Sequence, residues 1–214
     1  MQFYYIGFNL KKAFTMIELI IVIAVVGVIT AMVIPRFERD NLQEATEQVL
    51  KHIRYTQHLA MIDDVYDATQ PRWFTRRWQI EFLNCGGYKV YSDTDMSGVG
   101  DVTEAARDPY SGLLIYTDNT CTINSLRDDE HVRIGDWYDI TNIQLTGGCA
   151  AAQSIGYDNL GRPYNDINAS IPLLTSTSNL INNDCNITLT VLSGESAVIT
   201  IAKETGYARV SKWN

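Results

Sequence analysis

A long, nearly uninterrupted apolar stretch lies close to the N-terminus. Residues 14–34 contain a single charge, Glu18, and two lysines, Lys11 and Lys12, precede them. A helix of that length spans about 30 Å, which is the thickness of the hydrocarbon core of a bilayer. Basic residues favour the cytoplasmic side of such a segment, so the pattern predicts a transmembrane helix over residues 14–35. Glu18 is a functional candidate, because a carboxylate costs about 2.5–3.5 kcal/mol at the bilayer centre and less near the interface.

The periodicity changes after Pro35, and residues 36–62 have the pattern of an amphipathic helix. Apolar and small residues recur at intervals of three and four, with mainly charged residues between them; the recurring positions are Leu42, Ala45, Val49, Ile53, Thr56 and Ala60. Pro35 lacks a backbone N–H, so it should kink or loosen the helix between the two halves. We expect one long helix whose second half lays one face against a globular domain.

The remaining residues, 63–214, form the predicted globular head. Clusters of β-branched and aromatic residues, separated by Gly, Asn and Asp, are typical of strands and turns. Strands are expected over residues 78–83, 88–91, 113–117, 140–145, 154–157, 187–191, 197–202 and 207–211. The predicted fold class is α+β, in which a long N-terminal transmembrane-plus-amphipathic helix packs on a globular antiparallel β-sheet head.

Composition limits the classes of function. The 214 residues suit one soluble domain plus an anchor. The formal net charge of −8 disfavours generic binding of nucleic acid or anionic lipid headgroups. No nucleophile–base spacing, phosphate-binding loop or pair of catalytic carboxylates stands out in the sequence, so we expect that the protein is not an enzyme.

Four cysteines follow the apolar stretch, which is an even number suited to disulfides in an oxidising compartment. They allow three pairings. The favoured pairing is Cys85–Cys121 with Cys149–Cys185, because each bond would tie neighbouring parts of the same half of the sheet. Each bond should contribute about 2–4 kcal/mol. A zinc site is disfavoured, since no C-x-x-C motif or close pair of histidines is present.

An acidic loop follows the second expected strand. Residues 93–104 place side-chain oxygens at the first, third, fifth, ninth and twelfth positions and glycine at the sixth, which is the spacing of a calcium-binding loop. The seventh position would give its carbonyl oxygen; the expected ligands are Asp93, Asp95, Ser97, Val99, Asp101 and Glu104. The alternative is an acidic surface turn, which Asp, Ser and Gly also favour. A Ca²⁺ ion would stabilise the loop, and no cofactor is expected to be required.

The start of the apolar stretch resembles the prepilin signal of type IV pilins and type II secretion pseudopilins. The resemblance is carried by the run Phe14-Thr15-Met16-Ile17-Glu18-Leu19 and by the later Gly27 and Pro35. It implies that a prepilin peptidase removes residues 1–13 as a leader, cutting after Ala13, and methylates the new amino group of Phe14. The family usually has glycine before the cut, so Ala13 is a departure. Loss of the two leader lysines would change the formal charge from −8 to −10.

The resemblance also implies a location and partners. The protein would cross the inner membrane once, with a cytoplasmic N-terminus and a periplasmic head, and would enter a helical fibre through its N-terminal helix. Its partners would be the prepilin peptidase, other pilin or pseudopilin subunits, the inner-membrane assembly platform and the lipid bilayer. Glu18 would pair with the amino group of Phe14 of a neighbouring subunit, which offsets the cost of burying both charges.

The C-terminal part is similar to the GspH/FimT branch of pseudopilins. It carries Leu160-Gly161-Arg162-Pro163 and the later Glu204-Thr205-Gly206-Tyr207, and Gly161 suits a turn that needs a positive φ. The favoured function is therefore a minor pseudopilin of a type II secretion system. One alternative is a minor pilin of a type IV or DNA-uptake pilus that binds DNA through its head. Another is a membrane-anchored calcium-binding module.

The DNA alternative has four candidate arginines. Arg72, Arg76 and Arg77 alternate with aromatic residues, as in proteins that bind single-stranded nucleic acid. Some FimT-like relatives bind DNA through arginines near the C-terminal strand, where this chain has Arg209. The acidic background favours a different interpretation of residues 72–78, as the segment that leads into the first strand. DNA is therefore a partner that the sequence does not favour.

Overall fold

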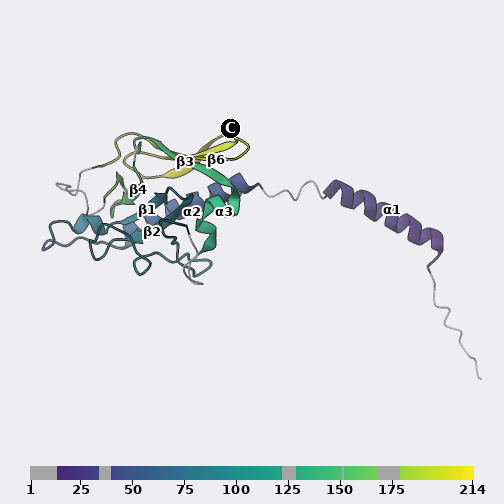
Figure 1. The fold of residues 1–214 in the computed structure, drawn as a ribbon, viewed down its shortest axis with the longest axis horizontal. Helices are drawn as coiled ribbons and strands as arrows, with labels where there is room; N and C mark the ends of the chain where they lie inside the picture. The colour runs from purple at the N-terminus through teal and green to yellow at the C-terminus, as the bar shows by residue number, and fades with distance from the viewer. Residues whose placement is uncertain (1–13, 34–39, 122–128, 151, 168–178) are drawn as a thin grey trace, which may run out of the picture. The chain divides into compact units, whose positions relative to one another are not determined.

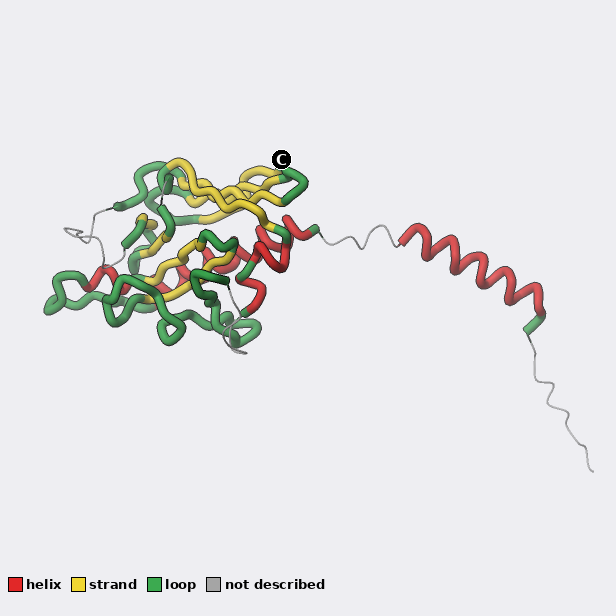
Figure 2. Tube along the Cα trace, in the orientation of Figure 1, coloured by secondary structure: helices red, strands yellow, loops and turns green. Residues whose placement is uncertain are grey.

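The computed structural model describes residues 14–33, 40–121, 129–150, 152–167 and 179–214 (Figure 1). The chain divides into two compact units after Arg39. The first unit contains α1 (Met16–Val33). The second unit, Asp40–Asn214, contains every other described element and is called the head unit below (Figure 2).

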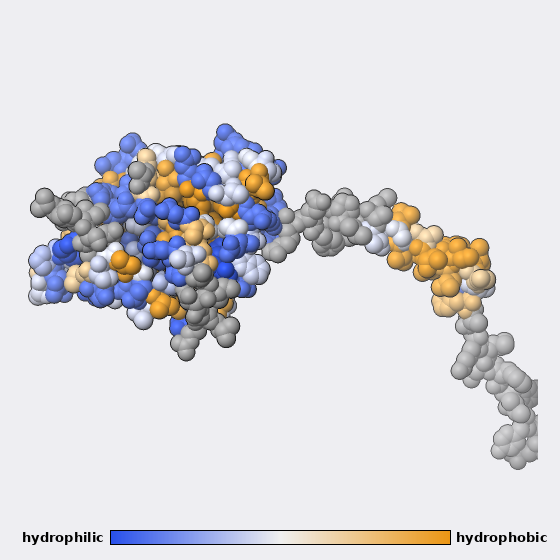
Figure 3. All heavy atoms as spheres, in the orientation of Figure 1, coloured by the Kyte–Doolittle hydropathy of each residue, from blue (hydrophilic) through white to orange (hydrophobic). Residues whose placement is uncertain are grey.

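Helix α1 is apolar on all sides. The side chains from Phe14 to Thr30 are all exposed, and the helix is mostly orange in Figure 3, with paler spheres near its two ends. Among the residues that the structure describes, no helix is long and apolar enough to cross a membrane. The expected span over residues 14–35 runs past Val33 into residues outside the described part of the chain.

Helix α2 (Asn41–Ile62) has its own start. The Asp40 carboxylate accepts a hydrogen bond from the Gln43 backbone N–H at 2.9 Å, and Asp40 has non-helical dihedrals of φ −80° and ψ 85°. Asp is a strong N-cap because its side chain satisfies a backbone donor that has no helical partner. The amphipathic helix was expected over residues 36–62; the described helix begins at Asn41, and residues 36–39 lie outside the described part of the chain.

The predicted apolar face of α2 is confirmed. All six predicted positions are buried, and two polar residues, Thr46 and His52, are buried beside them. The face contacts β1 and β4 of one sheet and β6, β7 and β8 of the other, so that a single core lies around the helix. Burial of an apolar side chain stabilises a fold by about 1.5–3 kcal/mol. The buried face of α2 therefore stabilises the head unit by holding both sheets against one helix.

The head unit contains two four-stranded antiparallel sheets instead of the single expected sheet. The first has the order β2-β1-β4-β5 and the second the order β3-β6-β7-β8. The strands are β1 (Trp78–Leu83), β2 (Gly87–Ser92), β3 (Ile140–Gly147), β4 (Ser154–Tyr157), β5 (Pro163–Asn165), β6 (Cys185–Val191), β7 (Ser196–Ile201) and β8 (Ala208–Trp213). The chain crosses between sheets after β2, β3 and β5. The pattern of residues within a strand does not indicate which sheet that strand joins. The α+β fold class is confirmed.

One expected strand is missing. Residues 113–117 form only an isolated bridge, between Leu114 and Arg107. The segment instead lies along β2, where the Val90 N–H donates to the Ile115 carbonyl oxygen at 2.9 Å. Three short helical elements were not expected, namely η2 (Trp73–Arg76), η3 (Glu130–Val132) and α3 (Ile134–Tyr138).

Two disulfides join the head unit in the favoured pairing, Cys85–Cys121 and Cys149–Cys185. The first links the β1–β2 turn to the segment after residue 117. The second links the start of β6 to the residues after β3, where Gly147 pairs with Cys185 in the sheet register. Each bond therefore fastens a connecting segment to the sheet that it leaves.

Candidate functional site

The start of α1 is built by a local cap. The Glu18 backbone N–H donates to the Thr15 hydroxyl oxygen at 3.3 Å, and the Leu19 N–H donates to the Thr15 carbonyl oxygen at 3.2 Å. This is the first half of a capping box, in which Thr or Ser precedes Glu by three residues. The acidic side chain also lies in the first turn, where the helix dipole favours negative charge. Helix capping and the helix dipole therefore explain an acidic residue at position 18, whether or not Glu18 also acts in assembly.

The Glu18 side chain is unsatisfied within the described part of the chain. Its carboxylate has no hydrogen bond or ion pair to a described residue, and Phe14 is 80% exposed. Ala13, the expected residue before the cut, lies outside the described residues. The arrangement leaves a carboxylate and an aromatic side chain together at one end of an apolar helix, both available to another molecule.

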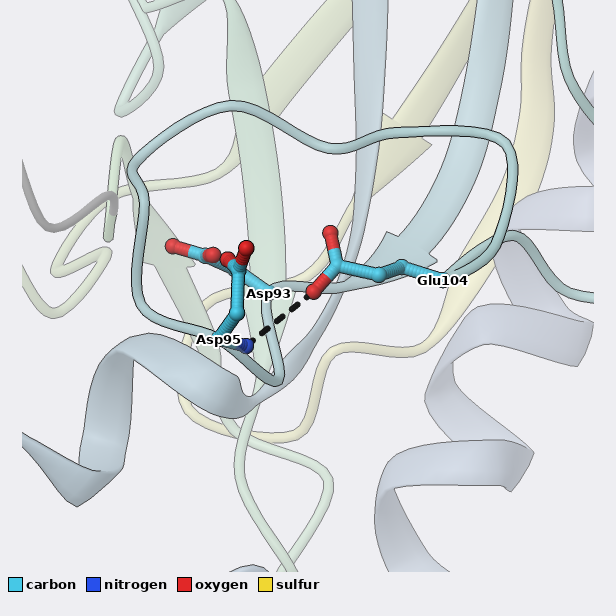
Figure 4. Close-up of side chains that lie close together, drawn as sticks. All are labelled: Asp93, Asp95 and Glu104. Atoms are coloured by element: carbon cyan, nitrogen blue, oxygen red, sulfur yellow. Dashed lines mark hydrogen bonds between the residues drawn. The ribbon is translucent and has the colours of Figure 1, made fainter.

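The acidic loop gathers three of its six expected ligands. One carboxylate oxygen from each of Asp93, Asp95 and Glu104 lies within 4.8 Å of the others (Figure 4). Asp93 directly follows β2, Glu104 begins the segment that returns along β2, and the Ser92 N–H donates to the Glu104 carbonyl oxygen at 3.3 Å. Gly98 has a φ of +85°, which is the sharp bend that the sequence predicts at this position.

Backbone donors hold these carboxylates in place. Glu104 Oε1 accepts from the Thr94 N–H at 2.6 Å and from the Asp95 N–H at 3.2 Å, as Figure 4 shows for Asp95. The two oxygens of Asp93 accept from the Ser97 and Gly98 N–H groups at 2.9 and 3.0 Å. Each carboxylate oxygen has two lone pairs, so both oxygens of Asp93 keep acceptor capacity. Glu104 Oε1 has none left, because it also accepts from the Thr94 hydroxyl at 2.9 Å, whereas Glu104 Oε2 accepts only from the Asp101 N–H, at 3.3 Å, among the described residues.

The other three expected ligands take part in hydrogen bonds within the loop. Asp101 Oδ1 accepts from the Thr103 backbone N–H and hydroxyl at 2.7 and 2.6 Å, and the Val99 carbonyl oxygen accepts from the Ser97 hydroxyl at 3.1 Å. Asp101 is not a member of the group formed by the three carboxylates. Turn-forming hydrogen bonds of Ser, Thr and Asp compete with metal ligation here.

Two carboxylates of this cluster, Asp93 and Asp95, have pKa values shifted in opposite directions. Burial, reinforced by the nearby Glu104 charge, raises the pKa of Asp93 to about 6. Hydrogen bonds from Ser97 lower the pKa of the exposed Asp95. Ionisation of Asp93 therefore costs more than ionisation of an ordinary Asp, and a bound cation would lower that cost.

The four candidate arginines do not form one surface. Arg77 is buried, and its guanidinium lies 4.4 Å from the centre of the Tyr164 ring and 5.1 Å from that of Trp73. Arg72 and Arg76 precede it, at the start and the end of η2 and ahead of β1 in the first sheet, whereas Arg209 is exposed on β8 in the second. The stacking makes Arg77 part of the packing before β1, as the favoured interpretation of residues 72–78 expects.

A buried polar network lies under α2 and was not predicted from the sequence. The two ring nitrogens of His52 lie 2.8 Å from Tyr88 Oη and 2.9 Å from Asp108 Oδ2, and Lys51 Nζ lies 2.7 Å from the same Asp108 oxygen. Burial lowers the pKa of His52 although Asp108 opposes the change. Burial alone would raise the pKa of Asp108, but the bonds from Lys51 and His52 hold it below its ordinary value.

The two C-terminal motifs meet on α2. Gln57 Nε2 donates to the Gly161 carbonyl oxygen at 2.9 Å and to the Thr205 carbonyl oxygen at 2.8 Å. Gly161 has a φ of +79°, as expected. A Cβ on Gly206 would lie 2.3 Å from the Gly161 carbonyl oxygen, so only glycine fits there. The contacts of Gln57 with Gly161 and Thr205 thus hold the two motifs together, and they are called the Gln57 joint below. Next to it, the Arg162 guanidinium donates to the Asp158 carboxylate at 2.7 Å.

Comparison with known proteins gives one finding. Residues 8–34 match the family model described as the prokaryotic N-terminal methylation motif. No curated protein matches the chain, and no solved structure matches it. The match includes Ala13, Phe14 and Glu18, which are the residues expected to carry processing and assembly.

The matched motif supports a type IV pilin-like protein that is anchored in a membrane. It implies processing by a prepilin peptidase and assembly with other pilin subunits. These conclusions rest on the match over residues 8–34, which contains the apolar helix α1.

Proposed function

We propose that the protein is a minor pseudopilin of a type II secretion system, of the GspH/FimT type, and that its role is fibre assembly in support of protein secretion. One observation carries the proposal: an all-round apolar helix, exposed from Phe14 to Thr30, lies within a methylation motif, and its Glu18 carboxylate has no partner among the described residues. Apolar surface of this kind requires lipid before assembly and neighbouring helices after it. The C-terminal motifs support the GspH/FimT branch.

The proposed mechanism uses the first residues of the mature chain. The prepilin sits in the inner membrane with a cytoplasmic N-terminus and a periplasmic head. Prepilin peptidase cuts after Ala13, and the assembly platform brings the subunit to the fibre. The new amino group of Phe14 then pairs with Glu18 of a neighbouring subunit. Removing one partner of such a buried pair costs about 3–5 kcal/mol, enough to set the axial register of the incoming subunit.

The test separates cleavage from assembly. Glu18→Ala should leave cleavage intact, seen as the N-terminal mass of the mature chain, and should abolish co-purification with the fibre. Glu47→Ala, which removes an exposed acid of α2, is the matched control and should assemble normally. Ala13→Trp should block cleavage, since a bulky side chain does not fit a site for small residues. Normal assembly of the Glu18→Ala protein would refute the pairing role.

The alternative of a DNA-uptake pilus makes a different demand on the head. Arg209 is exposed on β8 and is available to a phosphate, whereas the packing of Arg77 between two rings argues against residues 72–78 as the binding surface. Deletion of the gene should stop secretion of enzymes under the first proposal and stop transformation under the second. A DNA affinity that falls steeply with salt and is lost in Arg209→Ala would favour the second.

We also propose that the acidic loop binds a structural Ca²⁺ ion through Asp93, Asp95 and Glu104. Support comes from the proximity of their carboxylates and from the unfavourable ionisation of Asp93. Calcium should raise the Tm of the full chain in detergent micelles, and Glu104→Gln should remove the effect. Glu195→Gln, which changes an exposed acid in the β6–β7 turn, should keep it. An equal effect of magnesium and calcium in both variants would argue for an ordinary acidic turn. If the chain bound calcium but was cleaved and never assembled, the calcium-binding module would be the better function.

A further inference from the structure

The two sheets have four edges, and two of these are covered by the chain itself. Along β2, the Ala106 N–H donates to the Val90 carbonyl oxygen at 2.8 Å. Along β5, the Ile181 N–H donates to the Pro163 carbonyl oxygen at 3.0 Å. Both edges of the first sheet therefore have their backbone groups bonded to neighbouring segments, and neither offers a free row of donors and acceptors.

The third edge, on β8, is protected by charge and by irregularity. Arg209 and Lys212 are exposed on this strand, and its register with β7 shifts between Val198 and Ile199. The Arg54 guanidinium also binds the Ala208 carbonyl oxygen, at 2.9 Å. Edge charges and bulges are devices that stop another strand from pairing.

The fourth edge, on β3, lacks these devices over residues 142–146. In the described part of the chain, the backbone–backbone hydrogen bonds of these residues go only to β6, and the Thr146 carbonyl oxygen lies 3.3 Å from Cys149 Sγ. The five residues are Asn, Ile, Gln, Leu and Thr, without a charge or a proline, and the irregularity in this strand lies before Asn142. Alternate residues of an edge strand point their N–H and C=O groups outward, so β3 carries an unpaired row.

A cleft lies against this edge. It has a volume of about 370 Å³ and lies between residues 140–145 of β3, residues 82–86 at the β1–β2 turn, and residues 152–153. A second hollow of about 170 Å³ shares Phe82, Leu83, Asn84 and Gln153 with it, and so continues it along the end of β1. The free edge therefore faces a groove with a second wall instead of open solvent.

The groove is uncharged and rich in amides. No charged side chain lines the larger hollow, although 20% of the chain is charged. The one acid at the smaller hollow, Glu81, is paired with Lys89 at 3.3 Å. The amide side chains that line the larger hollow are Asn84, Asn142, Gln144 and Gln153. A charged ligand would lose hydration here without gaining a partner, whereas amides can donate to and accept from a peptide backbone.

We propose that the β3 groove binds an extended, uncharged peptide segment of another protein, which adds to the second sheet as a fifth strand beside β3. Main-chain hydrogen bonds to an exposed strand edge give affinity in this mode, and the second wall selects side chains. Charge complementarity identifies the occupant, since an uncharged groove in an acidic protein suits a segment without lysine, arginine or acids. The inference concerns the head unit alone and does not depend on the proposed role of Glu18.

The test uses the full chain in nanodiscs and capped seven-residue peptides. A peptide that alternates Thr and Val is compared with versions that carry Glu or Lys at alternate positions. The neutral peptide should bind at least about tenfold more tightly, a difference of about 1.4 kcal/mol, and should slow amide hydrogen exchange within residues 142–146. N-methylation of alternate amides should abolish binding in one frame and spare it in the other, because only every second residue faces β3.

Variants of the chain locate the site. Gln144→Lys puts a charge on the edge strand and into the groove, and should weaken binding of the neutral peptide at least about tenfold. Thr190→Lys makes the same kind of change on the neighbouring strand β6, away from the edge, and should leave binding unchanged. The proposal is overturned if no peptide protects residues 142–146, or if Gln144→Lys binds normally. It is also overturned if the chain self-associates and Gln144→Lys dissolves the assembly, since a second copy would then occupy the edge.

Discussion

The two disulfides allow a matched experiment, because each closes a segment with a sequence separation of 36 residues. If constraint of the unfolded chain were the whole effect, loss of either bond would lower the free energy of unfolding equally, by about 4 kcal/mol. The perturbation is the double variant Cys149→Ala/Cys185→Ala, and its control is Cys85→Ala/Cys121→Ala. Any difference between the two then measures the surroundings of each bond, with loop length held constant.

The surroundings differ in burial. Cys149 and Cys185 are fully buried, and Cys185 begins β6 opposite Gly147, the last residue of β3. Cys121 is 9% exposed and Cys85 is partly exposed beside the first turn. Truncation of fully buried side chains leaves a cavity, which adds about 1–2 kcal/mol for small groups. The expected losses are therefore about 5–6 kcal/mol for the buried pair and about 4 kcal/mol for the control.

Urea unfolding of the full chain in detergent micelles, followed by tryptophan fluorescence, measures both losses. Reduced wild-type protein should fall below both variants, because it lacks both bonds. Total stabilities of domains are about 5–15 kcal/mol, so the buried-pair variant should be close to unfolded at room temperature. Equal losses in the two variants would contradict the burial argument. A loss below about 1 kcal/mol in either would contradict the entropic one.

Three further changes test the head unit. Gln57→Ala removes two bonds to backbone carbonyls and should cost about 1–2 kcal/mol in urea unfolding, with Gln43→Ala, an exposed position, as a silent control. His52→Leu should cost about 2–4 kcal/mol, because it removes one hydrogen-bond partner from each of two buried groups, the Tyr88 hydroxyl and the Asp108 carboxylate; an unchanged Tm would contradict this. Because the pKa of Asp93 is raised to about 6, its contribution is full below its unfolded pKa of about 3.9 and is lost as pH rises through about 6. Asp93→Asn should flatten this part of the stability profile in calcium-free buffer.

Local patterns determined the features that could be predicted. The buried face of α2 follows from a repeat of three and four residues, and Leu42, Val49 and Ile53 lie where the repeat places them. The capping Asp40 was missed because the apolar and amphipathic patterns adjoin, and a single polar residue before Asn41 decides where the helix begins. A capping signal is weaker than a periodicity, although it is readable in principle.

Long-range choices could not be predicted. Asp108 is 56 residues from His52, and nothing near either residue identifies the other as its partner. Residues 113–117 have a strand-like composition, yet Asp108 accepts from the Tyr110 N–H at 2.6 Å and forms a turn that sends the segment along β2 without a ladder. The division into two sheets is a choice of the same kind, since antiparallel strands with similar patterns fit either sheet.

In the acidic loop, the spacing of the residues predicted only part of the arrangement of the expected ligands. Asp93, Asp95 and Glu104 converge as the spacing requires, because the bend at Gly98 brings the two ends of the loop together. Asp101 does not converge, because the adjacent Thr103 offers a donor at shorter range than the centre of the cluster. Spacing fixes which residues can meet, and local hydrogen bonds decide which of them do.

The stabilising contacts are divided unevenly between the two units, and this division predicts how mutations should act. The disulfides, the His52 network and the Gln57 joint all lie in the head unit, whereas α1 belongs to the other unit, and its side chains from Phe14 to Thr30 are exposed. Changes in the head unit should therefore lower its stability, and assembly only as a consequence. Changes on α1 such as Glu18→Ala should alter assembly while the urea midpoint of the head unit stays constant. An exposed apolar helix within a methylation motif is suited to contacts with lipid and with other pilin subunits.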